Sequence, residues 1–397
     1  MLQRLRKLIG FERKGGVGLT DPEALWLFGA LPTTSGVSVT GRSAVRVPAV
    51  AAAVSLISNS VATLPAKTFV SEGETKAADP AHPSYSLIHD RASPWVSAAE
   101  FRRLLTIDAL THPAPCGAGR GYALAVRVNG RVRELHRLDP NSVRVECADD
   151  GSPVYMINLA SGGTITRDWR DVLVIDAPGG CPVHHAREAI ALALVLEAHA
   201  ARLFANGGRP SGVLKFPGTL TPESTQRIKA SWQNAHAGSS SGGTAVLESG
   251  GDFIPLAFTS VDAEFMAQRQ FQIVEIARAF GVPVSMIGDL SRATWSNSLE
   301  QRQQFLMFSL LPWLRAWEAA YTRVLVADNE LDTHSIEFIT DDFLRADTAS
   351  RAEAYSKFRA AGVYTSNELR RLENLPPLPG GDKLDSPHVQ SPTKAAA

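Results

Sequence analysis

A serine lies in the sequence GSSSG at residues 238–242, which has the spacing of the G-x-S-x-G motif of serine hydrolases. In that motif a buried strand precedes the serine and a helix follows it, so that the hydroxyl projects from a tight turn. Here the local pattern predicts the reverse order, with a helix before Ser240 and a strand after it. An exposed loop tip rich in Gly and Ser is therefore preferred over a nucleophile.

Histidine and aspartate residues give weak signals for a metal site. His184 and His185 lack the H-E-x-x-H spacing, so a structural pair near a helix start is favoured. Asp341, Asp342 and Asp347 would suit a nuclease cluster, although Asp342 or Asp347 more readily serves as a helix cap. The G-x-x-x-x-G-K-[ST] pattern of nucleotide-driven motors does not occur. We predict no catalytic residue, metal or cofactor and retain an α+β hydrolase or nuclease as the alternative.

The composition is that of an ordinary globular chain. Of 397 residues, 44% are hydrophobic and 20% are charged, which suffices for a sizeable core. Lys and Arg total 40, as do Asp and Glu, so the net charge is zero. This balance disfavours a sequence-specific DNA-binding protein, which usually has a basic excess. It does not disfavour a protein that DNA moves past, because strong phosphate contacts would slow the DNA.

Three features bear on the compartment. Cys116, Cys147 and Cys181 are widely spaced without a C-x-x-C pair, which fits a reducing cytoplasm. The N-terminal sequence MLQRLRKLIGF is basic and amphipathic, but it lacks the continuous apolar core of a secretory signal. Residues 47–66 carry no charge, yet their polar side chains and flanking prolines favour a buried helix over a membrane span.

The elements that would position any site fall into two groups. The first is an α+β unit at residues 98–176, with a helix at 98–110, a helix at 48–64 before it, and a hairpin at Asn129-Gly130. The second is a pair of helices, 183–204 and 262–280, that enclose a small α/β insert in which Thr221 and Pro222 begin a helix. Two antiparallel helices with a small domain at their far end form a stalk with a head. The strands of the first group are expected at 122–128, 132–138, 143–147, 154–159, 164–165 and 172–175, and those of the insert at 213–216, 245–247 and 253–256.

Residues 271–325 are the most informative segment. A helix pattern stops at Gly281 and Pro283, a polar loop follows, and a longer helix pattern runs to residue 326. Pro312 lies in the middle of that helix, where it removes an amide donor and clashes with the carbonyl of Phe308, so a kink is expected. Leu306, Leu310, Trp313 and Trp317 recur at intervals of four and three, the spacing of a packing seam, and Phe308 beside them is expected to be buried as well.

This order of helix, loop and kinked helix resembles the HK97-type portal proteins of tailed phages. The resemblance is carried by the sequences IARAFGVP at 276–283, TWSN at 294–297 and LP at 311–312, together with Leu290, Glu300 and Phe305. It extends over roughly residues 40–380 in the family's order, through RVPAV at 46–50, NGGRPSGVL at 206–214 and FLRAD at 343–347. Residues 111–121, THPAPCGAGRG, depart from the family because their loop is longer and rich in Pro and Gly.

The resemblance implies an α+β portal fold that assembles as a ring. Its regions would be, in chain order, an N-terminal arm at 1–40, a wing at 41–182, a first stem helix at 183–207, a small α/β clip at 208–259, a second stem helix at 260–286, a tunnel loop at 287–297, a kinked tunnel helix and wing strand at 298–342, a short helical crown at 343–380 and a disordered tail at 381–397.

Three groups of side chains would then carry the function. In the tunnel loop, Arg292 would touch DNA phosphates and Trp295 would stack on or wedge against the DNA. The alternative is structural: Trp295 anchors the loop in protein, and Ser296 or Asn297 caps the next helix. The groups are Ser291, Arg292, Thr294, Trp295, Ser296 and Asn297 in the tunnel loop; Leu306, Leu310, Pro312, Trp313 and Trp317 in the tunnel helix; and Lys215, Arg227, Lys229 and Trp232 in the clip, where the terminase and adaptor would dock.

The implied function is mechanical rather than enzymatic. A ring of twelve copies at one capsid vertex would pass double-stranded DNA, without reading its sequence, during packaging and ejection. The partners would be the large terminase subunit, the major capsid protein and a head–tail adaptor, with no membrane. The protein would reside in the virion, and in the host cytoplasm during assembly. The alternatives are the hydrolase or nuclease above and another ring-forming virion adaptor.

Overall fold

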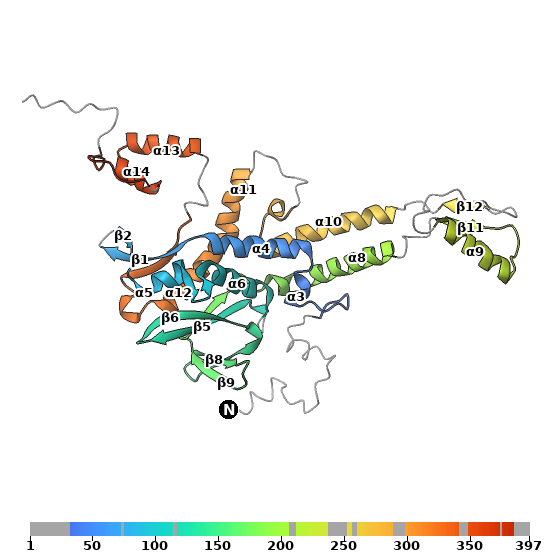
Figure 1. Ribbon diagram of the computed structural model, residues 1–397, viewed down its shortest axis with the longest axis horizontal. Coiled ribbons are helices and arrows are strands. Elements are labelled where there is room, and N and C mark those ends of the chain that lie inside the picture. Colours follow the sequence, from blue (N-terminus) through green and yellow to red (C-terminus); the bar gives the residue numbers. More distant parts are fainter. Residues whose placement is uncertain are drawn as a thin grey trace, which may run out of the picture.

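The computed structural model describes residues 32–72, 75–113, 117–205, 212–236, 252–255, 260–288, 298–340, 348–373 and 375–384. Figure 1 shows a body of helices and small sheets, a stalk that leaves the body sideways and bears a small head, and a separate helical pair near the C-terminus. The stalk is α8 (Arg187–Ala205) with α10 (Ser260–Phe280), and the C-terminal pair is α13 (Thr348–Ala360) with α14 (Ser366–Leu372). Helices and antiparallel sheets together confirm the α+β class.

Two helices at the centre of the body pack through small and apolar side chains. α4 (Pro48–Thr63), which follows the short α3 (Gly41–Ala44), lies against α6 (Ala98–Thr111). Val50, Ala53 and Ile57 of α4 are buried, so most of the uncharged run at 47–66 forms a core helix. Within the described residues, no helix has the length and apolar character needed to cross a membrane.

The predicted hairpin is present. β5 (Arg120–Val128) pairs with β6 (Arg131–Leu138), and the turn residues have φ of 52° at Asn129 and 78° at Gly130, as in a type I′ turn. A Cβ on Gly121 of β5 would lie 2.5 Å from the backbone oxygen of Leu105, so glycine is what lets α6 lie directly on this strand. β10 (Val172–Asp176) pairs with the other edge of β5, and β7 (Val143–Cys147), β8 (Pro153–Asn158) and β9 (Thr164–Asp168) form a second sheet.

A third sheet joins the two ends of the body, and most of it was not predicted. β1 (Ala66–Glu72) pairs antiparallel with β2 (Thr75–Ala78) and, on its other side, with β13 (His334–Phe338), the wing strand expected within 298–342. The hydroxyls of Thr68 and Ser84, 2.7 Å apart and buried, tie β1 to α5 (Pro83–His89). β3 (Arg91–Ser93) and β4 (Val96–Ser97) complete this region.

The helix expected at 183–204 is divided. α7 (Pro182–His185) ends at Ala186, whose N–H donates to the carbonyls of Pro182 and His184, and α8 starts at Arg187. The short turn places His184 over Gly117 and His185 over Gly180, where added Cβ atoms would lie 2.7 Å from the ring nitrogens. Packing of the two imidazoles against glycines therefore accompanies the break.

Both predicted loose ends need correction where the structure describes them. Val39, assigned to the arm, is fully buried in the core, and the backbone N–H of Thr34 donates to Glu188 of α8 at 3.1 Å. Residues 381–384, assigned to a disordered tail, lie against the C-terminal pair, since the Asn367 N–H donates to the Gly381 carbonyl and Arg359 donates to the Lys383 carbonyl. Backbone groups that find partners in this way hold both segments. Residues 1–31 and 385–397 lie outside the described chain.

Candidate functional site: the bent helix, the stalk and its base

The long helix at 298–325 is interrupted where Pro312 predicts it. α11 (Ser298–Gln304) passes into a six-residue π-helix (Phe305–Leu310), and α12 (Leu311–Leu325) begins with Pro312 in its first turn. A proline has no N–H for the preceding turn and its ring presses on that turn's carbonyl, so wider i→i+5 bonding just before it relieves both problems. The hydroxyl of Ser309 donates to the carbonyl of Gly281, which fixes the π-helix to the end of α10.

One face of this helix forms the centre of the body. Leu306, Leu310, Trp313 and Trp317 are buried, while Pro312 is exposed. The indole N–H of Trp317 donates to the Thr106 hydroxyl of α6 at 3.1 Å, and its ring lies 5.0 Å from that of Tyr321. Burial raises the pKa of Tyr321 to about 12, with Arg102 opposing the rise. The seam thus joins α12 to α6 within one protomer.

The opposite face of the π-helix is apolar and open. Phe308 is 80% exposed and Met307 is 57% exposed, so the expectation that Phe308 is buried was wrong. The expectation rested on apolar character alone. At 3.6 residues per turn Phe308 lies about 200° from Leu306, on the face opposite the packing seam.

The predicted tunnel-loop side chains, Ser291, Arg292, Thr294, Trp295, Ser296 and Asn297, lie outside the described residues. The structure does describe the flanks of this segment. A 3₁₀ turn (Val284–Ile287) ends at Gly288 with φ of 102°, and the Ser285 hydroxyl donates to the Gln301 side-chain oxygen of α11 at 2.8 Å. The two elements that flank residues 289–297 are therefore joined to each other.

The stalk carries a small head at its far end. β11 (Gly212–Lys215) pairs with β12 (Asp252–Pro255), and α9 (Pro222–His236) is preceded by Thr221, whose hydroxyl accepts from the Ser224 N–H. Lys215, Arg227 and Lys229 are exposed. Trp232 belongs to α9, but the surroundings of its side chain lie outside the described part, as does the strand expected at 245–247.

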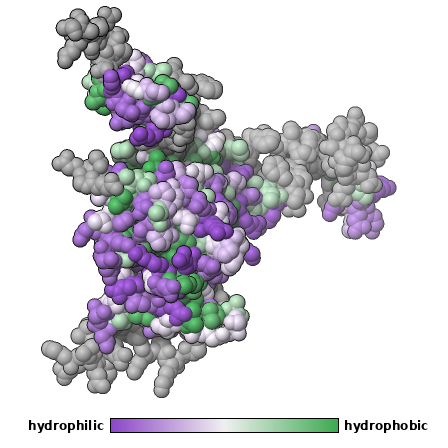
Figure 2. Space-filling view, turned by 60° about the vertical axis from the view of Figure 1, so that its left-hand side comes forward, coloured by the Kyte–Doolittle hydropathy of each residue, from purple (hydrophilic) through white to green (hydrophobic). Residues whose placement is uncertain are grey.

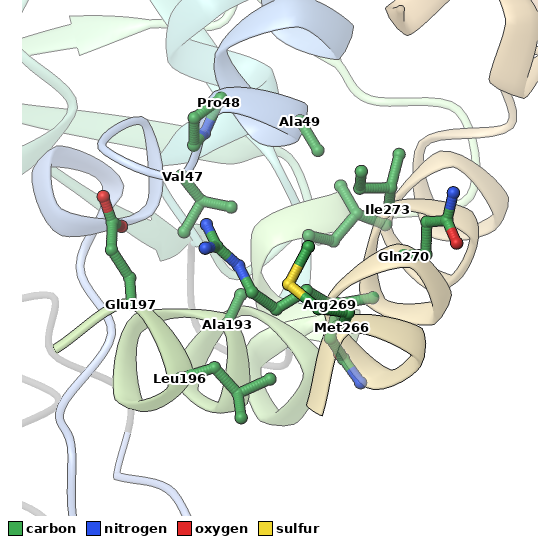
Figure 3. A pocket seen from close by; sticks show the side chains of 12 residues that line it. Val47, Pro48, Ala49, Ala193, Leu196, Glu197, Met266, Arg269, Gln270 and Ile273 are labelled. Carbon is green, nitrogen blue, oxygen red and sulfur yellow. The ribbon is translucent and has the colours of Figure 1, made fainter. Parts of the chain in front are cut away.

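A pocket of about 360 Å³ lies at the base of the stalk, a feature that sequence reasoning missed. Figure 3 shows Val47 and Pro48 at the start of α4, Ala193, Leu196 and Glu197 on α8, and Met266, Arg269 and Ile273 on α10 around it. Most of these walls are apolar, and the Arg269 guanidinium extends across toward the side of Val47 and Glu197. The residues that line the pocket come from three separate segments of the chain, so no local sequence motif predicts it.

Residues that suggested enzyme chemistry are not gathered into a site where the structure describes them. Burial lowers the pKa of His184, with Arg187 and His185 adding to the effect, and the two histidine rings meet edge to face at 5.5 Å. Across the described ranges, no group of three or more His, Cys, Asp or Glu side chains could hold a metal ion. Ser240, Asp341, Asp342 and Asp347 fall outside those ranges.

Comparison with known proteins gives consistent likenesses. The family model "Phage portal protein" matches residues 48–374. The probable portal protein of Streptomyces phage phiC31 is 35% identical over 382 residues, covering 91% of this chain and 81% of that protein. The portal protein of Enterobacteria phage HK97 is 29% identical over 340 residues, covering 83% and 78%. A chain in the virion of a native gene transfer agent particle is 26% identical with a TM-score of 0.61, covering 85% of this chain and 94% of that one.

The fold and these likenesses define a class of structural, non-enzymatic proteins built from a body, a helical stalk and a small head. The crystal structure of an HK97 family phage portal protein from Corynebacterium diphtheriae shares this fold, with a TM-score of 0.52 at 19% identity, over 76% of this chain and 95% of that one. This chain belongs to the phage portal protein family, and its role is that of a head–tail connector in the particle.

Proposed function

We propose that twelve copies of this chain close into a ring at one vertex of the capsid, and that double-stranded DNA passes through the ring during packaging and ejection. The neck of an empty gene transfer agent particle, computed with C6 symmetry, contains a chain 25% identical to this one with a TM-score of 0.62, covering 85% and 93% of the two chains. Sixfold symmetry is compatible with twelve subunits. Each protomer would meet the next head to tail, the interface type that generates closed rings.

The observation that carries the proposal is the stalk, which holds the head away from the body (Figure 1). A lone protomer gains little from two long helices that extend out of its core, whereas neighbouring stalks in a ring would line a channel. The head would then act as the clip, with Lys215, Arg227, Lys229 and Trp232 in reach of the large terminase subunit and later of a head–tail adaptor. The body would act as the wing and face the major capsid protein.

The segment at 287–297 would act as the tunnel loop. Its flanks are held together by the bond from Ser285 to Gln301, and the helix behind it is anchored by Trp313 and Trp317 in the core. A short segment with fixed ends on a rigid support can project into a channel and move there. Arg292 and Trp295 would contact the DNA transiently and without base reading, which fits the zero net charge. No enzymatic step is proposed for the chain.

The proposal is tested by packaging. Particles assembled from the cognate capsid protein and terminase should protect DNA from nuclease only when this chain is present. The charge reversals Arg227→Glu and Lys229→Glu should abolish most of that protection while rings still form, because they alter only the exposed surface of α9. Glu223→Lys, on the same helix, is the matched control. Nuclease-resistant DNA in particles that lack the chain would contradict the proposal.

A further inference from the structure

One residue that lines the pocket at the base of the stalk, Gln272, has a buried hydrogen-bond acceptor without a partner in the described part of the chain. Gln272 is 8% exposed, and its Oε1 has no hydrogen-bond partner among the residues that the structure describes. A buried polar atom without a partner is costly, so such sites usually indicate a missing donor. Gln272 lines the same pocket as Ile273 and Ile276. An occupant would therefore be mainly apolar and would donate at least one hydrogen bond.

The mouth of the pocket has apolar surface that is still open. Met266, which lines the pocket, is 62% exposed, although methionine is a residue that proteins usually cover. Glu197 on α8 and Arg269 on α10 both line the pocket, so its wall holds one acidic and one basic group (Figure 3). A segment with apolar side chains on one side and basic ones on the other would cover Met266 and pair with Glu197.

The described part of the chain begins against α8, the helix that forms one wall of this pocket. Thr34, close to the start of the described part, donates from both its backbone N–H and its hydroxyl to Glu188 of α8, at 3.1 and 3.0 Å. Glu188 and Glu197 lie on the same helix, about 13 Å apart along its axis at 1.5 Å per residue. The stretch between residues 11 and 32 can extend over roughly 70 Å. Residues 1–11 are thus within easy reach of the pocket.

These residues have the composition that the pocket requires. The sequence MLQRLRKLIGF supplies Leu2, Leu5 and Leu8 at a spacing of three, with Ile9 and Phe11 after them. Arg4, Arg6 and Lys7 lie between the leucines and are donors as well as cations. Neither the stalk, the head nor the bent helix gives this amphipathic sequence a role.

We propose that residues 1–11 dock in the pocket between α4, α8 and α10, with the leucines against Met266 and Ile273 and a donor of the segment on Gln272. The segment would fasten the base of the stalk to the body, since α8 and α10 belong to the stalk and Val47 and Pro48 to the body. The inference does not depend on ring formation, because every contact it uses can be made to a single copy of the pocket.

Photo-crosslinking of the full chain tests the docking directly. A photoreactive amino acid at Leu5 should crosslink to peptides that contain residues 193–197 or 266–276, as identified by mass spectrometry. The same amino acid at Thr20 is the matched control and should give at least ten-fold less of these products. Crosslinks from Leu5 to other regions, or none above the Thr20 level, would overturn the proposal.

Hydrogen exchange gives a second readout that needs no crosslinker. Leu5→Asp with Leu8→Asp should speed amide exchange in residues 266–276 about ten-fold, a 1.4 kcal/mol loss of protection. Ala193→Trp, which fills the pocket, should free residues 1–11, whose own exchange should rise. Gln3→Asp and the exposed-site change Ala201→Trp are the controls and should do neither. If a neighbouring protomer's body fills the pocket instead, exchange will change with ring formation but not with Leu5→Asp, and the proposal fails while the ring stands.

Discussion

The body buries Trp317, Tyr321 and Phe101 almost completely, whereas the C-terminal pair buries only Thr365 and Asn367 among its described residues. The pair instead leaves Phe358, Val363, Leu375 and Leu378 at least 43% exposed. Figure 2 shows green patches among purple ones on the lobe that stands above the body. Two regions of one chain therefore use different sources of stability.

Polar contacts take the place of a core in the C-terminal pair. The Asn367 side chain donates to the Leu378 carbonyl at 3.0 Å and accepts from the Leu378 N–H at 2.7 Å. Thr365 and Glu368 cap α14 reciprocally. Because burial of apolar area provides most folding free energy, we expect the body to resist unfolding alone and the pair to open locally at low cost. The body is therefore expected to be the part of the chain that can stay folded without the other.

The largest effect is expected from Trp317→Ala. The change removes a fully buried indole and leaves the Thr106 hydroxyl without its donor, so the free energy of unfolding of the body should fall by about 3–5 kcal/mol. Denaturant titration followed by circular dichroism measures this loss. Trp95→Ala is the control, since Trp95 is 72% exposed, and it should change stability by less than about 0.5 kcal/mol. Equal losses of stability from the two changes would contradict the view that the buried core stabilises the body.

Asn367→Ala should loosen the C-terminal pair without unfolding the body. Two hydrogen bonds to Leu378 are lost, which should lower local stability by about 1–3 kcal/mol. Hydrogen exchange should accelerate in residues 366–384, while the denaturation midpoint of the body stays constant. Lys357→Ala, which removes only an exposed pair with Glu353, is the control. A shift of the global midpoint with Asn367→Ala would show that the two regions unfold together.

Glu330 makes part of the body's stability depend on pH. Its hydrogen bonds to the Arg131 guanidinium hold the pKa of this carboxyl at about 2, below its ordinary value of 4.5. Because the pKa of Glu330 is lower in the folded state, its contribution to the free energy of unfolding is complete above pH 4.5 and is lost as the pH falls toward 2. Glu330→Gln should cost about 1 kcal/mol at neutral pH, because the pair is partly exposed, and should flatten stability between those limits. An unchanged acid profile would contradict this assignment.

The smallest effect on the isolated protomer is expected from Phe308→Ser. The ring is 80% exposed, so stability should change by less than about 0.5 kcal/mol. Ring assembly should be weakened much more, because an open apolar face on a central helix is suited to contact with a neighbour. Sedimentation of the variant beside Arg315→Ser, an exposed change on the same helix, separates the two effects. Equal assembly of both variants would leave the open face without a role.

Sequence reasoning located elements whose signals are local. Asn129 and Gly130 predict a turn because both residues tolerate a positive φ. Pro312 predicts an interruption of the helix at 298–325 because proline lacks an N–H. Strand β1 was not predicted because its partner β13 is more than 250 residues away in the sequence, and pairing over that distance leaves no local pattern. The exposure of Phe308 was missed because burial was inferred from apolar character, although its position two residues from Leu306 places it opposite the packing seam.

The candidate site was predictable only in part. The stalk and the bent helix follow from helix periodicity and its breaks, but the pocket at the stalk base needs three segments to meet before it exists. Gln272 carries no sequence signal, because a glutamine on a helix is ordinarily solvated. The part played by the tunnel-loop residues stays a prediction.

Mass measurement of the purified full chain in solution tests the central claim most directly. A ring of twelve copies predicts a species of about twelve times 42.6 kDa that shows a central hole in negative stain. A monomer should convert to that species when the capsid protein is added. A stable dimer or tetramer that persists in the presence of the capsid protein would contradict the account, because neither symmetry leaves a channel wide enough for duplex DNA.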